Sequence, residues 1–177
     1  MTEIDRPLLI DWLGSVEIRH LREPDLPLLE WEGEFIHFRR LYQDAYRRML
    51  RGLSVLWVAD LTGFGILGQV FIQLQCDRPE LCDGVNRAYL YGFRIRPDFR
   101  GCGLGSAMVA VVESDLCERG FSTLTLNVAR DNISAIRLYL RLGFQITAPE
   151  PGRWQYVDHT GMLVNVHEPA WRMEKKI

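Results

Sequence analysis

The spacing of apolar residues changes period several times along the chain, and each change predicts an element. Residues 15–21 alternate apolar and polar positions, which favours a strand. Residues 54–60 and 65–73 are mostly apolar, and the Thr62-Gly63 pair between them is typical of a hairpin turn. The first half of the chain therefore predicts three strands, of which the second and third form a hairpin.

Two helical segments are expected between the first strand and this hairpin. Glu23-Pro24-Asp25 begins a helical stretch that runs toward Trp31, because proline is tolerated in a first helical turn. A second helix is expected from about Phe35 to Arg51, with Gly52 as its end. The apolar stripe of this second helix consists of Phe38, Leu41, Ala45 and Met49.

The centre of the chain predicts a strand, a loop and a long helix. Residues 75–87 are polar and read as a loop, and the strand that follows, residues 88–96, stops at Pro97. Apolar residues then recur at helical spacing from Leu104 until Gly120 ends the helix. This stripe consists of Leu104, Met108, Val111, Val112 and Leu116.

The last third begins with a buried strand at residues 123–128, followed by a helix that Asp131 or Asn132 caps and that ends at Gly143. The tail, residues 144–177, reads as strands. Their separators are Pro149, Pro151, Gly152, Asp158–Gly161 and Pro169. The order strand, two helices, three strands, helix, strand, helix and two strands predicts an α/β fold with a mixed sheet.

Composition narrows the class of protein. The 177 residues, 47% hydrophobic and 25% charged, fit a single globular domain that spans residues 1–177. The net charge of −2 and the lack of a Lys or Arg block argue against nucleic acid as a partner. No apolar run approaches the roughly 20 residues of a bilayer span, and Glu3, Asp5 and Arg6 do not begin a signal peptide. We therefore expect a cytoplasmic protein without membrane partners.

The cysteines and histidines show neither C-x-x-C pairing nor metal-ligand spacing. In a chain without a secretory signal, such cysteines are typically reduced thiols. We therefore expect neither a metal nor a disulfide. The residues concerned are Cys76, Cys82, Cys102, Cys117, His20, His37, His159 and His167.

The segment between the strand ending near Arg96 and the helix starting near Leu104 carries three alternating glycines, Gly101, Gly103 and Gly105. Glycines let the backbone approach a ligand closely, and successive amides at a helix N-terminus form a phosphate cradle. The P-loop motif fails because the segment lacks lysine, and the dinucleotide fingerprint fails because the glycine spacing differs. A glycine-rich turn without a ligand is the alternative interpretation.

The pattern Arg100-x-x-Gly103-x-Gly105, between a strand and an amphipathic helix, resembles the acetyl-CoA signature of the GNAT superfamily. The resemblance continues through Asn132-x-x-Ala135-x-x-Leu138-Tyr139 and Leu142-Gly143-Phe144, and it covers residues 88–146. It implies a mostly antiparallel mixed sheet flanked by helices. It also implies an N-acetyltransferase that uses acetyl-CoA as cosubstrate and transfers the acetyl group directly to an amine.

The resemblance assigns roles to individual residues. The loop amides would hold the CoA pyrophosphate, the strand before the loop would pair with the pantetheine arm as an added strand, and an asparagine at the next helix would reach the same arm. These cofactor-binding residues are Phe93, Arg94, Ile95, Arg100, Gly101, Cys102, Gly103, Leu104, Gly105, Ser106 and Asn132. For Asn132, a simple helix cap is the alternative, and both roles are compatible.

Tyr139 matches the family tyrosine near the cofactor sulfur and is the predicted catalytic residue. A phenol with a pKa of about 10 can donate a proton or a hydrogen bond to a departing thiol; a core aromatic is the alternative role. Some family members, including those that modify protein N-termini, carry a glutamate base where this chain has Asn127. Tyr91, Glu34 or a water chain are the substitutes that the sequence offers. Gly92, in mid-strand, marks either a bulge beside the reacting carbonyl or a tight packing point.

The acceptor carries no sharp motif, and both a small molecule and a protein or peptide amine fit. In this fold, the early helices and the tail strands shape the acceptor pocket. Candidate features are the acidic residues Glu30, Glu32 and Glu34 and the aromatic residues Trp31, Trp154, Tyr156 and Trp171. A CoA-binding module without turnover is the rival function, and a homodimer is the default assembly for a small enzyme.

Overall fold

A computed structural model describes residues 12–177, so the N-terminal charges that argued against a signal peptide lie outside the described range. Seven strands form one sheet in the order β1-β2-β3-β4-β5-β9-β6, and β7 and β8 form a second, two-stranded sheet. Within the large sheet, every neighbouring pair is antiparallel except β4 and β5, which confirms a mixed, mostly antiparallel sheet. The strands are β1 (Val16–His20), β2 (Ser54–Leu61), β3 (Gly65–Gln73), β4 (Arg87–Ile95), β5 (Thr123–Ala129), β6 (Gln145–Glu150), β7 (Arg153–Val157), β8 (Leu163–His167) and β9 (Ala170–Lys176).

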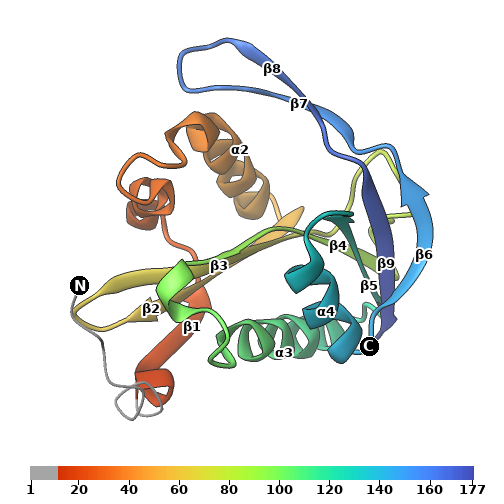
Figure 1. Cartoon of the computed structure of the whole chain (residues 1–177), viewed down its shortest axis with the longest axis horizontal. Coiled ribbons are helices and arrows are strands. Elements are labelled where there is room, and N and C mark those ends of the chain that lie inside the picture. The colour runs from red at the N-terminus through yellow and green to blue at the C-terminus, as the bar shows by residue number, and fades with distance from the viewer. Residues whose placement is uncertain (1–11) are drawn as a thin grey trace.

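Helices cover both faces of the sheet. Figure 1 shows α3 and α4 on one face, and α2 with the first helical segment on the other. None of the helices in residues 12–177 is long and apolar enough to cross a membrane. The α-helices are α2 (Arg39–Leu50), α3 (Leu104–Glu118) and α4 (Ile133–Arg141), and the 3₁₀ segments are η2 (Leu13–Ser15), η3 (Glu23–Glu30), η4 (Ile36–Phe38) and η5 (Pro97–Phe99).

The sheet separates two hydrophobic clusters. The larger one lies under α3 and α4, where Leu104, Met108, Val112 and Leu116 are buried as the helical spacing predicted. The smaller cluster lies under α2 and includes Tyr42, Ala45, Leu56 and Phe71. Strands of the sheet contribute to both clusters because successive side chains point to opposite faces.

The early helical region is less regular than its sequence predicted. Residues 23–30 form a 3₁₀ helix that contains Pro27, and Trp31 and Glu32 then take positive φ angles of 45° and 58°. The next α-helix begins at Arg39 rather than Phe35, after a short 3₁₀ turn. These left-handed residues follow the end of the 3₁₀ helix at Glu30.

The tail holds four strands, whereas the sequence predicted only two. Strand β6 runs through Pro149, which was expected to separate strands. Since β6 is the edge of the large sheet, the missing proline N–H breaks no required ladder bond. Strands β7 and β8 form a hairpin that arches toward α2, as Figure 1 shows, and the expected turn at Asp158–Gly161 joins them.

Strands β4 and β5 separate at the centre of the sheet. Their pairing runs only from Arg87 opposite Thr123 to Leu90 opposite Leu126. Beyond it, residues 91–95 have no ladder partner on the β5 side among the described residues. Both readings of Gly92 are supported: the register shifts against β3 there, with a φ of 59° at Gly92, and a Cβ atom at Gly92 would stand 3.1 Å from the Phe71 ring. The sheet is therefore open between these two strands at the carboxyl end of β4.

Candidate active site

The glycine loop takes backbone conformations that other residues rarely adopt. Gly101 and Gly103 have φ angles of 73° and 90°, in the left-handed region. Gly105 lies inside the first turn of α3, where a Cβ atom would stand 3.4 Å from the side chains of Ile95 and Leu138. The three glycines thus serve two purposes: the first two shape the loop, and the third lets α3 approach β4 and α4.

The backbone amides of this loop have no acceptors in the described part of the protein. Ala107 donates the first amide hydrogen bond of α3, to the carbonyl of Gly103 at 3.0 Å. Among residues 12–177, none of the amides from Gly101 to Ser106 has a hydrogen-bond acceptor, and the first turn of α3 contains no acidic residue. Free amides at the positive end of a helix dipole favour an anion.

Arg100 connects this loop to the open strand. Its Nε atom donates to the carbonyl oxygen of Ile95 at 2.8 Å. The side chain of Cys102 contacts the carbonyl of Arg100, with Sγ at 3.4 Å. The loop and the carboxyl end of β4 are thereby held side by side.

Asn132 caps α4, which confirms one of the two roles expected for it. Its Oδ1 atom accepts a hydrogen bond from the backbone N–H of Ala135 at 3.2 Å. The side-chain NH₂ group has no acceptor among the described residues, and the residue is exposed. The cap therefore leaves both amide hydrogens available to a ligand.

Tyr139 is buried on α4 and packs edge-on against Phe144, with ring centroids 5.5 Å apart. Burial raises the pKa of its phenol well above the usual value, and the nearby Tyr89 adds to this effect. The phenol therefore keeps its proton at neutral pH. That state suits a hydrogen-bond or proton donor.

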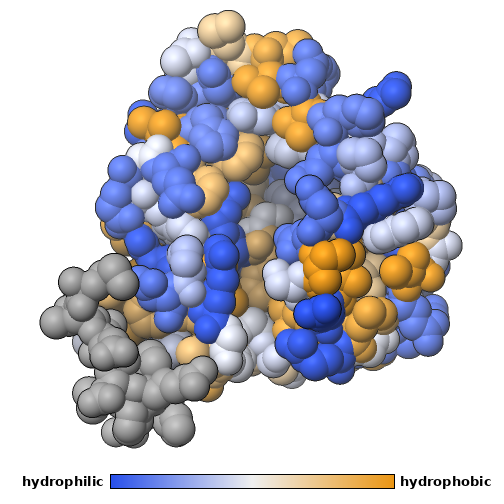
Figure 2. Space-filling model, viewed as in Figure 1, coloured by the Kyte–Doolittle hydropathy of each residue, from blue (hydrophilic) through white to orange (hydrophobic). Residues whose placement is uncertain are grey.

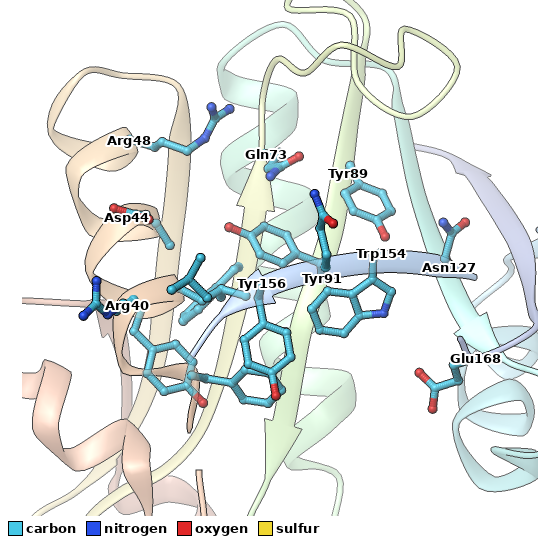
Figure 3. Close-up of a pocket in the computed structure, with 18 of the residues that line it drawn as sticks. Arg40, Asp44, Arg48, Gln73, Tyr89, Tyr91, Asn127, Trp154, Tyr156 and Glu168 are labelled. Carbon is cyan, nitrogen blue, oxygen red and sulfur yellow. The ribbon is translucent and has the colours of Figure 1, made fainter. Parts of the chain in front are cut away.

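A cleft of about 1210 Å³ opens on the α2 side of the sheet. Figure 2 shows the hollow, flanked by hydrophilic side chains. Helix α2 forms one wall, β7 another, and β4 and β5 the floor. Figure 3 shows Arg40, Asp44 and Arg48 on the α2 side, with Asn127 and Glu168 across the cleft.

Aromatic rings line the middle of this cleft. The ring centroids of Phe38 and Tyr156 are 4.9 Å apart, and those of Trp154 and Tyr156 are 5.4 Å apart. The contact between Phe38 and Tyr156 joins the β7–β8 hairpin to the start of α2. Trp154 and Tyr156 therefore lie where the acceptor pocket was expected, whereas Trp31 and Trp171 do not line the cleft.

The residues proposed as substitutes for the missing base differ in whether they line the cleft. Tyr91 lines the cleft, but burial raises its pKa to about 12, and that of Tyr89 likewise to about 12, so both phenols hold their protons at neutral pH. Glu34 does not line the cleft. Asn127 does, and its Oδ1 atom is buried without a hydrogen-bond partner among the described residues.

The acidic residues expected to attract a cationic amine are already neutralised in two cases out of three. Arg39 binds Glu30 through two hydrogen bonds of 2.6 and 2.9 Å. Arg96 binds Glu32 through two bonds of 2.9 and 2.8 Å. None of the three glutamates lines the cleft, which favours the alternative role of a charged surface face.

Sequence reasoning missed the charged lining of the cleft. Seven arginines and three carboxylates line it within the described residues, although the sequence showed no obvious basic block. Four of the arginines lie on α2, and the density of arginine in residues 39–51 is the signal that could have revealed them. The residues are Arg39, Arg40, Arg47, Arg48, Arg78, Arg94, Arg153, Asp44, Glu150 and Glu168.

No group of three or more potential metal ligands occurs among residues 12–177. The chemistry of the region is instead defined by free backbone amides on one side of the open strand and by arginines and aromatic rings on the other.

Comparison with known proteins shows the family to which the chain belongs. The sequence profile of the Acetyltransferase (GNAT) family matches residues 16–144, well over half of the chain. The chain belongs to the GNAT acetyltransferase family, which confirms the resemblance noted in the sequence. The [ribosomal protein bS18]-alanine N-acetyltransferase of Escherichia coli strain K12 is 38% identical over 60 residues, which are 34% of this chain. The match spans 40% of that relative's length.

Solved structures share the fold. Ard1 from Thermoplasma volcanium has a TM-score of 0.70 at 21% identity, over 92% of this chain and 98% of that one. The ribosomal-protein-S18-alanine N-acetyltransferase from Escherichia coli has a TM-score of 0.66 at 22% identity, over 92% and 94%. The spermidine/spermine N-acetyltransferase SpeG from Vibrio cholerae has a TM-score of 0.66 at 15% identity, over 92% and 93%. Since the acceptors named for these proteins differ, the shared fold does not select an acceptor.

Proposed function

We propose that this protein transfers the acetyl group of acetyl-CoA to a primary amine by direct attack in a ternary complex. One observation carries the proposal: the loop of free amides, the unpaired edge of β4 and the lined cleft all meet at the opening between β4 and β5. A thioester lying in that opening would have its phosphates at the loop and its acetyl group at the cleft.

The residues present fit acetyl-CoA, which would supply an activated acetyl group. In this proposal, the amides of Gly101 to Ser106 bind the pyrophosphate, with Arg100 holding the loop against β4. The backbone of Phe93, Arg94 and Ile95 pairs with the pantetheine amides as an added strand. The free NH₂ group of Asn132 donates to the same arm.

The transfer needs a donor for the leaving group. As the amine nitrogen bonds to the carbonyl carbon, the carbon–sulfur bond breaks and negative charge develops on sulfur. Tyr139, protonated and buried, would donate a hydrogen bond or its proton to that sulfur.

The transfer also needs an acceptor for the proton that the ammonium loses. Glu168 is the one lining carboxylate without an ion-pair partner among the described residues. It lies on the same side of the cleft as Asn127 in Figure 3. Glu168 would therefore take the role for which Asn127 is chemically unsuited, directly or through water.

The test is a thermal-shift titration with acetyl-CoA, with ATP and NAD as controls. A ligand at a hundredfold over its Kd adds about 2.7 kcal/mol to the unfolding free energy. We expect acetyl-CoA, but neither ATP nor NAD, to raise the melting temperature in a saturable manner. We also expect an amine to cause the release of free CoA. No shift with acetyl-CoA, or a larger shift with ATP or NAD, would contradict the proposal.

A second candidate function is a CoA-binding module without turnover, which the neutral Asn127 favours. Acetyl-CoA would then stabilise the protein, yet no amine would release CoA. A panel of small amines, polyamines and peptides, assayed for free thiol, separates the two functions.

A further inference from the structure

The cleft carries a charge opposite in sign to that of the whole chain. Its lining has seven arginines and three carboxylates in the described residues, a formal charge of +4, which falls to +3 when Glu30, the partner of Arg39 outside the lining, is included. The complete chain has a net charge of −2. The positive charge is therefore concentrated where the acceptor would bind.

Most of the lining carboxylates are already paired, so they leave little negative potential. Arg47 binds Asp44 at 2.8 Å, and Glu150 contacts Arg78 at 2.7 Å and Arg172 at 3.5 Å. Of the three lining carboxylates, only that of Glu168 has no ion-pair partner within residues 12–177. A substrate entering the cleft thus meets one free carboxylate.

Several lining arginines, by contrast, have no carboxylate partner in the described part of the chain. Arg94 lies over the Phe35 ring at 3.6 Å and donates to the Tyr42 hydroxyl at 2.8 Å. Arg48 donates to the carbonyl of Gln75 at 2.7 Å, and its buried Nε has no acceptor. The arginines of this kind are Arg40, Arg48, Arg94 and Arg153.

These arginines are not explained by the phosphates of CoA. None of residues 100–106 lines the cleft, and the free amides of the loop already provide an anion site. The arginines come from α2, β4 and β7 and surround the acceptor side instead. Their common field acts on whatever occupies that side.

The distribution of charge along the cleft gives the occupant a direction. Figure 3 places Arg40 and Arg48 on α2, Glu168 and Asn127 at the opposite side, and Trp154 and Tyr156 between them. An ammonium group favours the end with the free carboxylate and the aromatic faces. Anionic groups favour the α2 side, where Arg40 and Arg48 lie, whereas the unpaired Arg153 lies on β7, opposite His167.

We propose that the acceptor is an acidic amine: a molecule whose primary amine is followed by carboxylate or phosphate groups that bind the arginines of α2. This inference rests on the proposed acetyltransferase function and specifies its substrate class. A polyamine is disfavoured, because its additional positive charges would face Arg40 and Arg48. The acidic group could belong to a free amino acid or to the residues that follow a peptide N-terminus.

The experiment compares acceptors that differ only in charge. Acetylation of the peptides Ala-Asp-Glu-Tyr, Ala-Asn-Gln-Tyr and Ala-Lys-Arg-Tyr, all amidated, is measured as CoA release by the full chain. Free glutamate and glutamine, assayed in parallel, separate the amino-acid source from the peptide source. We expect kcat/KM for the acidic acceptor to exceed that of its neutral match by about tenfold, which is about 1.4 kcal/mol. The ratio should fall at high salt, because salt screens exposed charges.

Variants that remove a positive charge test whether the preference for acidic over neutral acceptors arises in the cleft. In Arg40→Gln and Arg48→Gln, the ratio of acidic to neutral kcat/KM should fall by several-fold, and further in the double variant. Arg51→Gln is the matched control, since Arg51 follows the last turn of α2 but does not line the cleft. Its ratio should equal that of the unmodified protein.

The possible failures are distinguishable. Equal rates for the three peptides, or a preference for the basic one or for a polyamine, would overturn the acidic class and leave the acetyltransferase function standing. An acidic preference that Arg40→Gln and Arg48→Gln leave unchanged would overturn the assignment to these arginines. Normal binding of acetyl-CoA with no turnover of any acceptor would overturn both proposals.

Discussion

The candidate site has two halves that are built from different parts of the polypeptide. The proposed cofactor half, residues 93–95 and 100–106, relies on backbone groups: free amides at the start of α3 and the unpaired edge of β4. The acceptor half, which is the cleft, relies on side chains from α2, β4, β5, β7 and the link between β8 and β9. Backbone amides are the same in any sequence that folds this way, whereas side chains vary. Under the proposed function, this difference would let one fold keep a cosubstrate while its acceptor changes.

The largest expected effect comes from placing a side chain in the cofactor half. Gly103→Val should weaken acetyl-CoA binding on the order of a thousandfold, because losing two hydrogen bonds to a charged group costs about 3–6 kcal/mol. The left-handed φ of 90° adds strain for valine. Titration calorimetry measures the change.

Gly120→Val is the matched control for this variant. Gly120 lies just beyond the other end of α3 and has a φ of 88°, and a Cβ atom added there would meet no neighbouring atom within 4 Å. This variant should lose a similar amount of stability and keep its affinity for acetyl-CoA. If both variants lose affinity equally, backbone strain in α3 rather than the loop explains the loss.

The second prediction concerns Tyr139, which lies on α4, outside both halves, and which would donate to the sulfur of the leaving group. Tyr139→Phe should lower kcat by about a hundredfold, the usual scale for a lost general acid, with the Kd for acetyl-CoA within a factor of about two or three of its original value, a change of well under 1 kcal/mol. Steady-state kinetics and a binding titration give the two numbers. Tyr46→Phe is the control, because Tyr46 lies on α2 and outside the cleft lining. An unchanged kcat in Tyr139→Phe would mean that Tyr139 contributes to packing and not to the chemistry.

The third prediction tests the acceptor half through Glu168. Glu168→Gln should lower kcat by about tenfold near neutral pH, where the amine must lose a proton before attack. The deficit should shrink as the pH approaches the amine's own pKa, about 8 for an α-amino group. A pH–rate profile of both proteins measures this, with Glu34→Gln as a control outside the cleft. A deficit that is constant with pH would indicate positioning rather than proton transfer.

The smallest expected effect concerns stability. The hydrogen bonds from Arg39 hold the pKa of the Glu30 carboxyl below its ordinary value, against the opposing effect of burial. A carboxyl with a lowered folded pKa stabilises the protein above its unfolded pKa of about 4.5, and the contribution is lost as the pH falls through the folded value.

Glu30→Gln should therefore lower the unfolding free energy by about 1 kcal/mol at pH 7, the upper end for an ion pair near the surface. The difference from the unmodified protein should disappear in acid. Thermal unfolding between about pH 3 and pH 7 tests this, and a constant difference over that range would mean that the ion pair is not its source.

The backbone features of the proposed cofactor half could be predicted from sequence because their determinants are local. Three glycines, the helix that follows and the cap at Asn132 lie close together in the chain, and each leaves a mark in the sequence. The bulge at Gly92 was one of two readings open at that position, since a glycine inside a strand commonly marks a bulge or a close approach. The same local signals placed α3, β5 and α4 within a few residues of their observed bounds.

Trp154 and Tyr156 were predicted for the acceptor half, but its charged lining was not, because those residues are distant in sequence. Arg48 and Glu168 line one cleft only after the sheet forms, and no spacing in the chain connects them. The partners of the early glutamates were not visible in the sequence either: Arg39 and Arg96, which pair with Glu30 and Glu32, are separated from them by nine and 64 residues. Pro149 misled because its tolerance depends on β6 being an edge strand, a property of the whole sheet.

The way the β7–β8 hairpin is attached has a consequence for how this protein can diversify. Strands β6 and β9 pair with each other up to Glu150 and Ala170, and the hairpin leaves the sheet between these two residues. At its neck, the N–H of Glu168 donates to the carbonyl of Gly152 at 2.9 Å, and a Cβ at Gly152 would overlap the Glu168 carbonyl. The length and sequence of the hairpin beyond Gly152 can therefore change without altering the register of β6 and β9.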